Sequence, residues 1–242
     1  MTTSPHPALL HLLSLALLLQ CVLGGDSYLY QICSNSENYT SNSIYNTNLN
    51  KVMASLFRRV PPTGFGLVSV GQNHHRVYGL ALCRGDVSSK DCKICIANAK
   101  TEIRKGCPNH KEAIIWYDYC LLKYSNYDFF GKIDSPKFIM VNSQNVSDPA
   151  PFNKKTKELL NKAAHEAYLS SKKYASGELV FSRSEKLYGL AQCTRDLSTA
   201  YCKECLNVAL SYLPTCCDGI QGGRVVGGSC NIRYELYPFL NF

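Results

Sequence analysis

The clearest apolar pattern in the first half of the chain has helical spacing. Positions i, i+3, i+4, i+7 and i+8 are occupied by Leu49, Val52, Met53, Leu56 and Phe57, so one face of a helix would be apolar. Because proline lacks an N–H group, we expect this helix to end before Pro61-Pro62. A second helix is expected to begin at Ser88, with Asp91 three residues later as a variant of the capping box.

Similar stripes recur further along the chain. The helix that begins at Ser88 would bury Cys92, Cys95, Ile96, Ala99 and Ile103. In the second half, Asn153 could cap a helix whose apolar face carries Leu159, Leu160, Ala163 and Ala167. A fourth helix would bury Cys202, Cys205, Leu206, Ala209 and Leu213.

Strand-like runs lie between these helices. They span Leu67–Val70, Val77–Leu82, Ile114–Tyr124, Leu179–Phe181, Leu187–Gln192 and Val225–Leu236. The last run alternates apolar and polar positions, which is typical of a half-buried strand. In each half the order is helix, strands, helix, strand, so the pattern predicts an α+β fold with an antiparallel sheet packed on two helices.

The cysteine spacing repeats after 110 positions. Cys83-x8-Cys92-x2-Cys95 recurs as Cys193-x8-Cys202-x2-Cys205, and the same shift carries Tyr78-Gly-Leu-Ala81 onto Tyr188-Gly-Leu-Ala191. We therefore expect two tandem domains of about 105 residues each. The expected ranges are 26–141 for the first domain, 142–151 for a polar, proline-bearing linker, and 152–242 for the second domain.

The N-terminus predicts secretion. Residues 8–19 form an apolar run, and Gly24 and Gly25 follow it as small residues, so we predict a signal peptide over residues 1–25. No second apolar stretch reaches the roughly 20 residues of a membrane span, and we expect no transmembrane anchor. The mature protein is expected to be secreted into the extracellular space.

Composition narrows the function further. The chain has 26 basic and 18 acidic side chains, a net charge of +8, which could attract acidic wall polymers. A solvated helix face explains its lysines equally well, and we expect no nucleic-acid partner. GxSxG, HExxH and a glycine-rich phosphate loop are all missing from the sequence, so we expect no catalytic residues and no cofactor.

The cysteines are expected to form disulfides. Of the 13 cysteines, Cys21 lies in the signal peptide, and the remaining even number would be oxidised outside the cell. Zinc would need four ligands, and a thioredoxin-like centre would need a βαβ unit, so we expect no metal site. Spacing alone does not fix the connectivity.

Two sequons, at Asn38 and Asn145, predict glycosylation.

These motifs carry a family resemblance. Two copies of C-x8-C-x2-C, with Cys216-Cys217-Asp-Gly and Ser229-Cys230-Asn-Ile-Arg-Tyr-Glu235, resemble the plant cysteine-rich repeat secretory proteins. Their module is the ginkbilobin-homologous, or salt-stress-response/antifungal, domain. The resemblance implies two tandem domains, each a five-stranded antiparallel sheet packed on two helices and stapled by disulfides. The same domain pair forms the ectodomains of cysteine-rich receptor-like kinases.

The resemblance also implies disulfide pairs. Carried over to this sequence, they are Cys33–Cys107, Cys83–Cys92, Cys95–Cys120, Cys193–Cys202 and Cys205–Cys230. The second copy has no counterpart of Cys33, and this leaves Cys216 and Cys217 unassigned. A bridge between these two neighbours and a bond between domains would both satisfy parity.

A metal-free mannose site made of an Asn, an Arg and a Glu is the family's known binding chemistry. The first copy has Ser34, Ile114 and Ser125 at those positions, so its site should be inactive. The second copy keeps Arg224 and Glu235, and Asn142 lies beside the third position. A plainer interpretation is that Arg224 and Glu235 form a cross-strand ion pair.

We therefore expect a non-enzymatic defence or stress protein. The leading hypothesis is an antifungal protein that binds mannose-type glycans or a cell-wall polysaccharide through its second domain. The alternative is a protein-interaction module that binds an extracellular partner, such as a receptor-like kinase, without recognising sugar.

Overall fold

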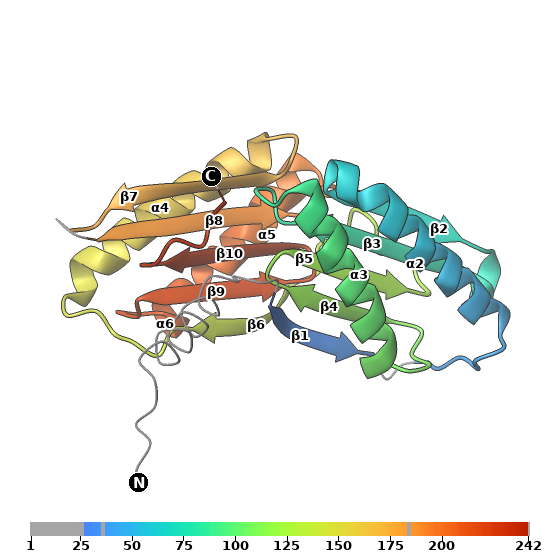
Figure 1. The fold of residues 1–242 in the computed structure, drawn as a ribbon. Coiled ribbons are helices and arrows are strands. Elements are labelled where there is room, and N and C mark those ends of the chain that lie inside the picture. The colour runs from blue at the N-terminus through green and yellow to red at the C-terminus, as the bar shows by residue number, and fades with distance from the viewer. Residues whose placement is uncertain (1–26, 35–36, 183–184, 242) are drawn as a thin grey trace, which may run out of the picture.

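The computed structural model describes residues 27–34, 37–182 and 185–241, which form two similar modules side by side (Figure 1). The first contains β1 (Tyr28–Cys33), α2 (Ile44–Thr63), β2 (Phe65–Val70), the short helix η1 (Asn73–His75), β3 (Val77–Cys83), α3 (Ser89–Gly106), β4 (Ala113–Tyr117) and β5 (Cys120–Ser125). The second contains β6 (Pro136–Val141), α4 (Pro149–Leu169), β7 (Tyr174–Val180), β8 (Lys186–Cys193), α5 (Thr199–Ser211), α6 (Leu213–Cys216), β9 (Gly222–Gly227) and β10 (Cys230–Glu235). The predicted signal peptide, residues 1–25, lies outside the described residues.

Each module is built on a five-stranded antiparallel sheet. The strand orders are β1-β4-β5-β3-β2 and β6-β9-β10-β8-β7, so the expected α+β fold of two tandem sheets with helices is confirmed. The register repeats as well: Cys83 lies opposite Cys120, and Cys193 lies opposite Cys230. In Figure 1, α2 and α3 lie in front of the first sheet, whereas α4 and α5 lie behind the second.

Two of the predicted strands are hairpins. The run expected as one strand over Ile114–Tyr124 is divided into β4 and β5 by a turn at Asp118 and Tyr119. The run over Val225–Leu236 is likewise divided into β9 and β10 by Gly228 and Ser229. The polar turn residues interrupt the apolar run and reverse the chain.

The helix boundaries differ from the sequence prediction in two places. Helix α2 continues through Pro61 and Pro62 to Thr63 and is closed by Gly64, whose N–H donates to the carbonyl of Val60. Because neither proline has an N–H group, the carbonyls of Phe57 and Arg58 lose their helical partners, and the helix ends one residue after Pro62. Helix α4 begins at Pro149, after Asp148 as its N-cap, and Asn153 therefore does not cap it. The prediction for Ser88 is confirmed, because its hydroxyl accepts a hydrogen bond from the N–H of Asp91.

The second sheet begins earlier in the chain than the predicted domain boundary. Strand β6, which the expected division after residue 141 assigned to the first domain, pairs with β9 along Phe138–Val226 to Val141–Gly223. Helix α4 also begins inside the expected linker 142–151. The edge strand of the second sheet is thus supplied by the segment that leaves the first module, as β1 supplies the edge of the first.

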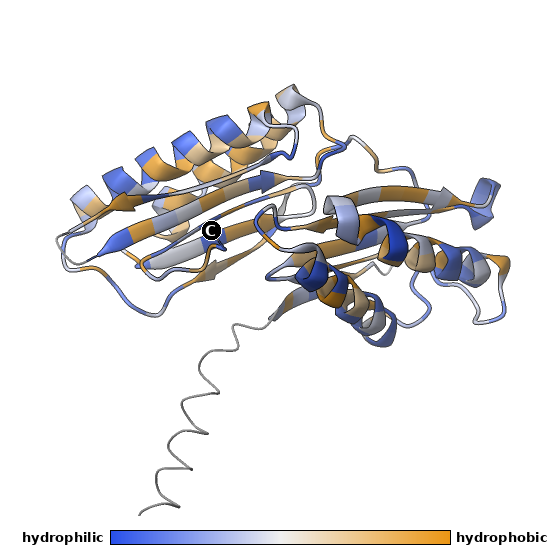
Figure 2. Cartoon of the chain, turned by 45° about the horizontal axis from the view of Figure 1, so that its top comes forward, coloured by the Kyte–Doolittle hydropathy of each residue, from blue (hydrophilic) through white to orange (hydrophobic). Residues whose placement is uncertain are grey.

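The helices cover one face of each sheet and bury two separate cores. The first core includes Leu49, Val52, Leu56, Ile96 and Ile115, all fully buried, and the second includes Phe152, Leu160, Leu206, Val225 and Ile232. The outward sides of the helices are polar, as the hydropathy colouring of α4 shows (Figure 2). Burial of these apolar faces is the main stabilising contribution to each module.

Six disulfides reinforce the modules. Five of them are the pairs that the family resemblance implies: Cys33–Cys107, Cys83–Cys92, Cys95–Cys120, Cys193–Cys202 and Cys205–Cys230. The sixth joins the neighbours Cys216 and Cys217, which is the first of the two alternatives left open by the sequence. The second module therefore has no bridge that ties its first strand to its second helix.

The modules dock through their hairpin turns. The Trp116 indole on β4 donates a hydrogen bond of 2.9 Å to the carbonyl of Gly227, at the β9–β10 turn. Its ring also packs edge-on against Phe138 of β6, with 5.2 Å between ring centroids. In return, the β4–β5 turn of the first module brings Asp118 to two arginines of the second sheet. Each hairpin turn thus contacts the other module's sheet, on the face that is not covered by helices.

Candidate functional site

Strand alternation places three charged side chains on the uncovered face of the second sheet. Val225, Ile232 and Tyr234 point into the core beneath the helices, so their neighbours on β9 and β10 point the other way. These neighbours are Arg224, Arg233 and Glu235, and Arg224 lies directly opposite Arg233 in the strand register.

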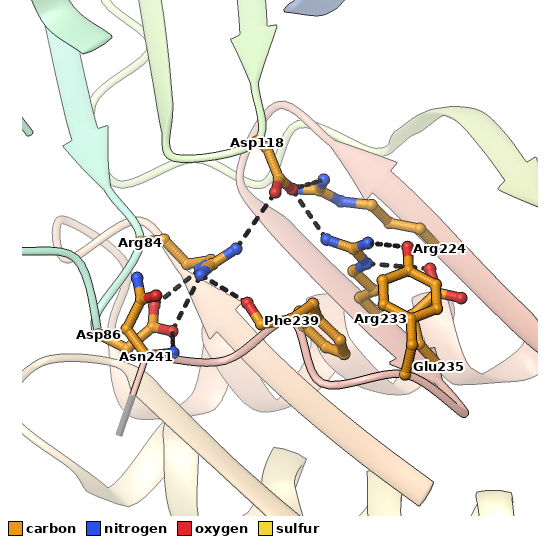
Figure 3. A network of polar contacts seen from close by, with 9 residues as sticks. Arg84, Asp86, Asp118, Arg224, Arg233, Glu235, Phe239 and Asn241 are labelled. Atoms are coloured by element: carbon orange, nitrogen blue, oxygen red, sulfur yellow. Dashed lines mark hydrogen bonds and ion pairs between the residues drawn. The ribbon is translucent and has the colours of Figure 1, made fainter. Parts of the chain in front are cut away.

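Asp118 connects these side chains to the first module (Figure 3). Its Oδ1 lies 2.8 Å from Nη1 of Arg224 and 2.9 Å from Nη1 of Arg233. Its Oδ2 lies 3.4 Å from Nη1 of Arg84. Arg233 also contacts Glu235, with 3.1 Å between Nε and Oε1. One carboxylate from the first module therefore serves two arginines of the second.

The C-terminal segment closes the network. Arg84 binds both oxygens of Asp86, at 2.7 and 3.0 Å, and donates to the carbonyl of Phe239 at 3.0 Å. The N–H of Asn241 donates to Asp86 Oδ2 at 2.9 Å. The ring of Phe239 also covers the Arg233 guanidinium, which lies 4.1 Å from the ring centroid. Residues 237–241 are thus held across both modules.

Burial and charge oppose each other in this network. Burial alone would raise the pKa of Asp118, but the charges of Arg224, Arg233 and Arg84 outweigh it and hold that pKa below its usual value. Burial lowers the pKa of Arg224 to about 10, against the opposing effect of Asp118. Burial raises the pKa of Glu235, against the opposing charge of Arg233. At neutral pH Arg224 therefore remains charged and depends on Asp118 as its counterion.

A cavity of about 690 Å³ lies over this face, between the second sheet, the C-terminal segment and the first module. We call it the junction cavity. Its lining includes Asn142, Arg224 and Glu235, so the structure brings together the three residues predicted for sugar binding. The first module contributes Leu29 and Asp118 to the wall, a contribution that the sequence analysis did not identify.

The predicted ion pair between Arg224 and Glu235 is wrong. Each of the two has another partner, Asp118 for Arg224 and Arg233 for Glu235. The register explains this, because Glu235 lies opposite Gly222 and only Arg233 faces Arg224. A Cβ atom at Gly222 would lie 1.7 Å from Oε2 of Glu235. Glycine at this position therefore makes room for the carboxylate.

A second, much smaller cavity lies beneath Arg224. It has a volume of about 30 Å³ and is lined in part by Arg224, Thr194 and Asn231. Arg224 Nε, Thr194 Oγ1 and Asn231 Oδ1 are buried and find no hydrogen-bond partner among the described residues. A cavity of this size, surrounded by three polar atoms, suits one buried water molecule.

On the corresponding face of the first sheet, the buried Lys123 pairs with Asp134 at 2.6 Å, and its neighbours are mostly apolar. Ile114 lies in an apolar cluster with Trp116 and Leu121, and Ser125 is fully buried. These are the residues that the sequence analysis placed at the inactive site. Arg84 and Asp118 were missed because they come from the first module, whereas Arg233 was not singled out although it lies in the quoted motif beside Glu235. One sequence signal for Asp118 was that the 110-residue shift aligns it with Gly228, so the two copies differ in charge at this position.

Within residues 27–34, 37–182 and 185–241, no three His, Cys, Asp or Glu side chains are grouped so that they could hold a metal ion. In the same part of the chain, no helix has both the length and the apolar character needed to cross a bilayer.

Comparisons with known proteins agree with this architecture. Residues 32–127 and 140–237 match the salt stress response/antifungal family. An antimicrobial ginkbilobin-2-like protein of Castanea crenata is 57% identical over 214 residues, covering 88% of this chain and 89% of that protein. Cysteine-rich repeat secretory protein 38 of Arabidopsis thaliana is 51% identical over 219 residues, covering 89% and 86%.

A solved structure shows the same arrangement. The tandem DUF26 ectodomain of the Arabidopsis thaliana cysteine-rich receptor-like protein PDLP8 is 27% identical, with a TM-score of 0.79 over 88% of this chain and 99% of that one. The two relatives are named as an antimicrobial protein and a secretory protein. The chain belongs to the salt stress response/antifungal family, as a secreted cysteine-rich repeat protein with two DUF26 modules in tandem.

Proposed function

We propose that this protein acts in the apoplast as an antimicrobial protein that recognises a hexose unit of a mannose-type glycan in the junction cavity. The observation that carries the proposal is that Asn142, which follows β6, lines one cavity with Arg224 of β9 and Glu235 of β10. A guanidinium donates, a carboxylate accepts and an amide does both, which suits a ring of hydroxyl groups. The antimicrobial name of the relative from Castanea crenata supports the same role.

The hydrogen-bonding state of the three residues is compatible with a ligand. Oε1 of Glu235 accepts from Arg233, whereas Oε2 is buried and finds no partner among the described residues. Asp118 is the one acceptor of Arg224 among those residues. The Asn142 oxygen accepts from the N–H of Gln144, which leaves its amide N–H groups as donors. Tyr237, half exposed at the same cavity, adds an aromatic surface against which a sugar ring can pack.

Glycan binding by isosteric variants tests the proposal. Titration of the oxidised protein with mannan oligosaccharides should show saturable binding, weakened at least 10-fold by Glu235→Gln and by Asn142→Ala. Glu178→Gln is the matched control, because Glu178 lies on the same sheet in an exposed ion pair with Lys186. Arg224→Ala is less suitable, since it also disrupts the contact with Asp118. No binding up to millimolar ligand, or equal binding by all variants, would reject the sugar site.

A second candidate function rests on the adjoining edges of the two sheets. Tyr28 and Tyr30 of β1 and Ile139, Met140 and Val141 of β6 are exposed, and Tyr30 meets Phe138 with 5.3 Å between ring centroids. Exposed strand edges bind extended segments of other proteins. Under this alternative the partner is an extracellular protein such as a receptor-like kinase ectodomain. Tyr30→Glu should then weaken the complex while glycan binding is unchanged.

The two sequons occupy equivalent places. Asn38 forms an isolated bridge with His110, and Asn145 forms one with Ile220. Both asparagines are exposed, so we propose that both carry glycans in the secreted protein. Enzymatic removal of N-glycans should lower the apparent mass in two steps, each abolished by replacing one asparagine with glutamine.

A further inference from the structure

A cavity of about 600 Å³ lies in the second module between α4, α5 and α6. We call it the helical cavity. It shares no lining residue with the junction cavity and plays no part in the proposed glycan binding. Its walls include Leu210, Leu213, Pro214 and Cys217, and Thr156 and Asn207 provide polar groups.

The repeat shows which side chains occupy this place in the first module. Tyr39 and Val146 are equivalent, because their N–H groups donate to the carbonyls of Asn109 and Gly219, which are themselves 110 positions apart. The Tyr39 ring packs on Tyr45, with 5.2 Å between ring centroids. At the equivalent position the second module has the much smaller Val146.

An arginine completes the filling in the first module. Arg104 donates to the hydroxyl of Tyr39 and to Oδ1 of Asn46, the latter at 2.7 Å, and so spans the gap between α3 and α2. The same position in the second module, 110 residues later, is Pro214, which cannot reach across. The exchange of Tyr39 and Arg104 for Val146 and Pro214 leaves the space between the helices open.

The disulfide of the second module forms part of the wall. Cys107 is tied to β1 through Cys33, whereas its equivalent Cys217 is tied to its neighbour Cys216. Cys217 lines the helical cavity beside Tyr234, whose hydroxyl donates to the carbonyls of Cys217 and Ile220. The ring and the sulfur are held in place, and sulfur makes favourable contacts with aromatic rings.

A buried hydroxyl in this wall has no partner. Thr156 on α4 is 5% exposed, and its Oγ1 finds no hydrogen-bond partner among the described residues. Four residues after Phe152, it occupies the place of Leu49, which lies four residues after Tyr45 and is fully buried. A buried polar group without a hydrogen-bond partner is unfavourable. The threonine that the second module has in place of leucine is therefore explained if a bound molecule supplies the hydrogen bond.

We propose that the helical cavity binds a small, uncharged phenolic molecule. Its aromatic ring would lie against Leu213, Pro214 and Cys217, and its hydroxyl would pair with Thr156 after rotation of that side chain. A sugar fits less well, because its hydroxyl groups would lose hydrogen bonds to water where they face Leu210, Leu213, Pro214 and Cys217. Neither an anion nor a cation is favoured, because the lining holds one charge of each sign, Asp218 and Lys157.

Titration of the oxidised protein with 4-ethylphenol, followed by two-dimensional amide NMR, tests the proposal. Saturable shifts are expected at Thr156 and Leu213, with weaker binding of 4-ethylanisole, which lacks the donor, and of 4-ethylbenzoate, which is charged. The proposal would be overturned if no saturable shifts appeared up to 10 mM 4-ethylphenol, or if all three probes bound equally well. Glu235→Gln should leave phenol binding unchanged, which separates this test from that of the junction cavity.

The first module supplies the decisive variant. The double substitution Val146→Tyr with Pro214→Arg copies Tyr39 and Arg104, and should weaken phenol binding at least 10-fold by filling the cavity. Val208→Tyr, on the exposed side of α5, is the matched control and should have no effect. If the double variant does not fold, Thr156→Leu tests the proposal instead. This variant should bind 4-ethylphenol and 4-ethylanisole equally well, because the hydroxyl that pairs with the phenol is gone. A preference that persists in Thr156→Leu would contradict the proposal.

Discussion

The uncovered faces of the two sheets occupy equivalent positions, but the first is mostly apolar and the second carries a cluster of charges. On the first sheet, Ile114, Trp116 and Leu121 lie in an apolar cluster that Val226 and Phe138 of the second module complete. On the second sheet, Arg224 and Arg233 take the equivalent positions of Ile114 and Lys123 and bind Asp118. The first module therefore uses this face to pack apolar side chains against the second module, and the second module uses it to place charged side chains along the junction cavity.

The comparison separates two kinds of stabilisation. Burial of apolar surface favours docking without fixing an orientation. Buried ion pairs contribute less net stability because the charges lose their hydration, yet removal of one partner leaves the other uncompensated. The first face should thus supply most of the docking free energy, and Asp118 should fix how the second module sits against the first. Four predictions test the contrast between the two modules, beginning with the largest expected effect.

The disulfides offer the strongest contrast between the modules. Replacement of Cys33 and Cys107 by serine opens a loop with a sequence separation of 74, and the loop-entropy relation gives a loss of about 4.5 kcal/mol. Replacement of Cys216 and Cys217 opens no loop and should cost less than about 1 kcal/mol by the same relation. Urea unfolding of both double variants measures the difference. Similar losses would show that the bridge between neighbours stabilises by another route.

Removal of Asp118 should have the next largest effect. Asp118→Ala leaves Arg224 buried without its counterion, and such losses are about 3–5 kcal/mol. We expect about 3 kcal/mol, at the lower end, because Arg233 keeps Glu235 and the Asp118 side chain is 22% exposed. Glu102→Ala is the control, since its pair with Lys105 is exposed. Equal stability of the two variants would mean that the modules are aligned without Asp118.

A single methyl group tests the packing beneath the junction cavity. Gly222→Ala places a Cβ atom against the Glu235 carboxylate and should destabilise the second module by about 2 kcal/mol, a usual value for overpacking. Gly177→Ala on β7 is the matched control, because its added Cβ would meet only Leu159, at 3.6 Å. If thermal unfolding shifts equally in both, the position of Glu235 is not tightly constrained.

The pH dependence of stability should be the smallest effect. The lowered pKa of Asp118 means that its stabilisation is complete above its unfolded value, near 3.9, and is lost as the pH falls through the folded value. The raised pKa of Glu235 has the opposite sign, so its protonation on mild acidification should stabilise the fold. Asp118→Asn should flatten the acid limb of a thermal-unfolding series, and Glu235→Gln should remove the rise that precedes it. A wild-type acid limb unchanged by Asp118→Asn would contradict this assignment.

Local patterns in the sequence predicted the modules well. The stripe from Leu49 to Leu56 and the cap at Ser88 are encoded within a few residues, and the structure shows both. The spacing Cys83-x8-Cys92 also repeats in Cys193-x8-Cys202, which revealed the duplication. Errors occurred where the signal was weak, as at Asn153, where a good N-cap residue instead holds the Asp218–Gly219 loop through its side chain.

The site was only half predictable. Arg224 and Glu235 could be named because the family motif includes them, and Asn142 because it lies beside the third position. Asp118 could not, because it lies 106 residues from Arg224 and meets it only once the two modules dock. Pairing of β6 with β9 was missed for a similar reason, since a short edge strand next to a presumed linker shows no local sign of which sheet it joins.

The apolar face of the first sheet has a consequence during biosynthesis. The last strand of the first module ends at Ser125. The uncovered face of its sheet is buried only when Phe138 and Val226 pack on it, and the Trp116 indole has its hydrogen-bond acceptor only when Gly227 is present. Until the last hairpin has left the ribosome, a nascent chain would display Trp116 and Leu121 to whatever lies nearby, a typical route to aggregation. Secretion of this protein should therefore depend on folding factors that shield that surface while the second half of the chain is made.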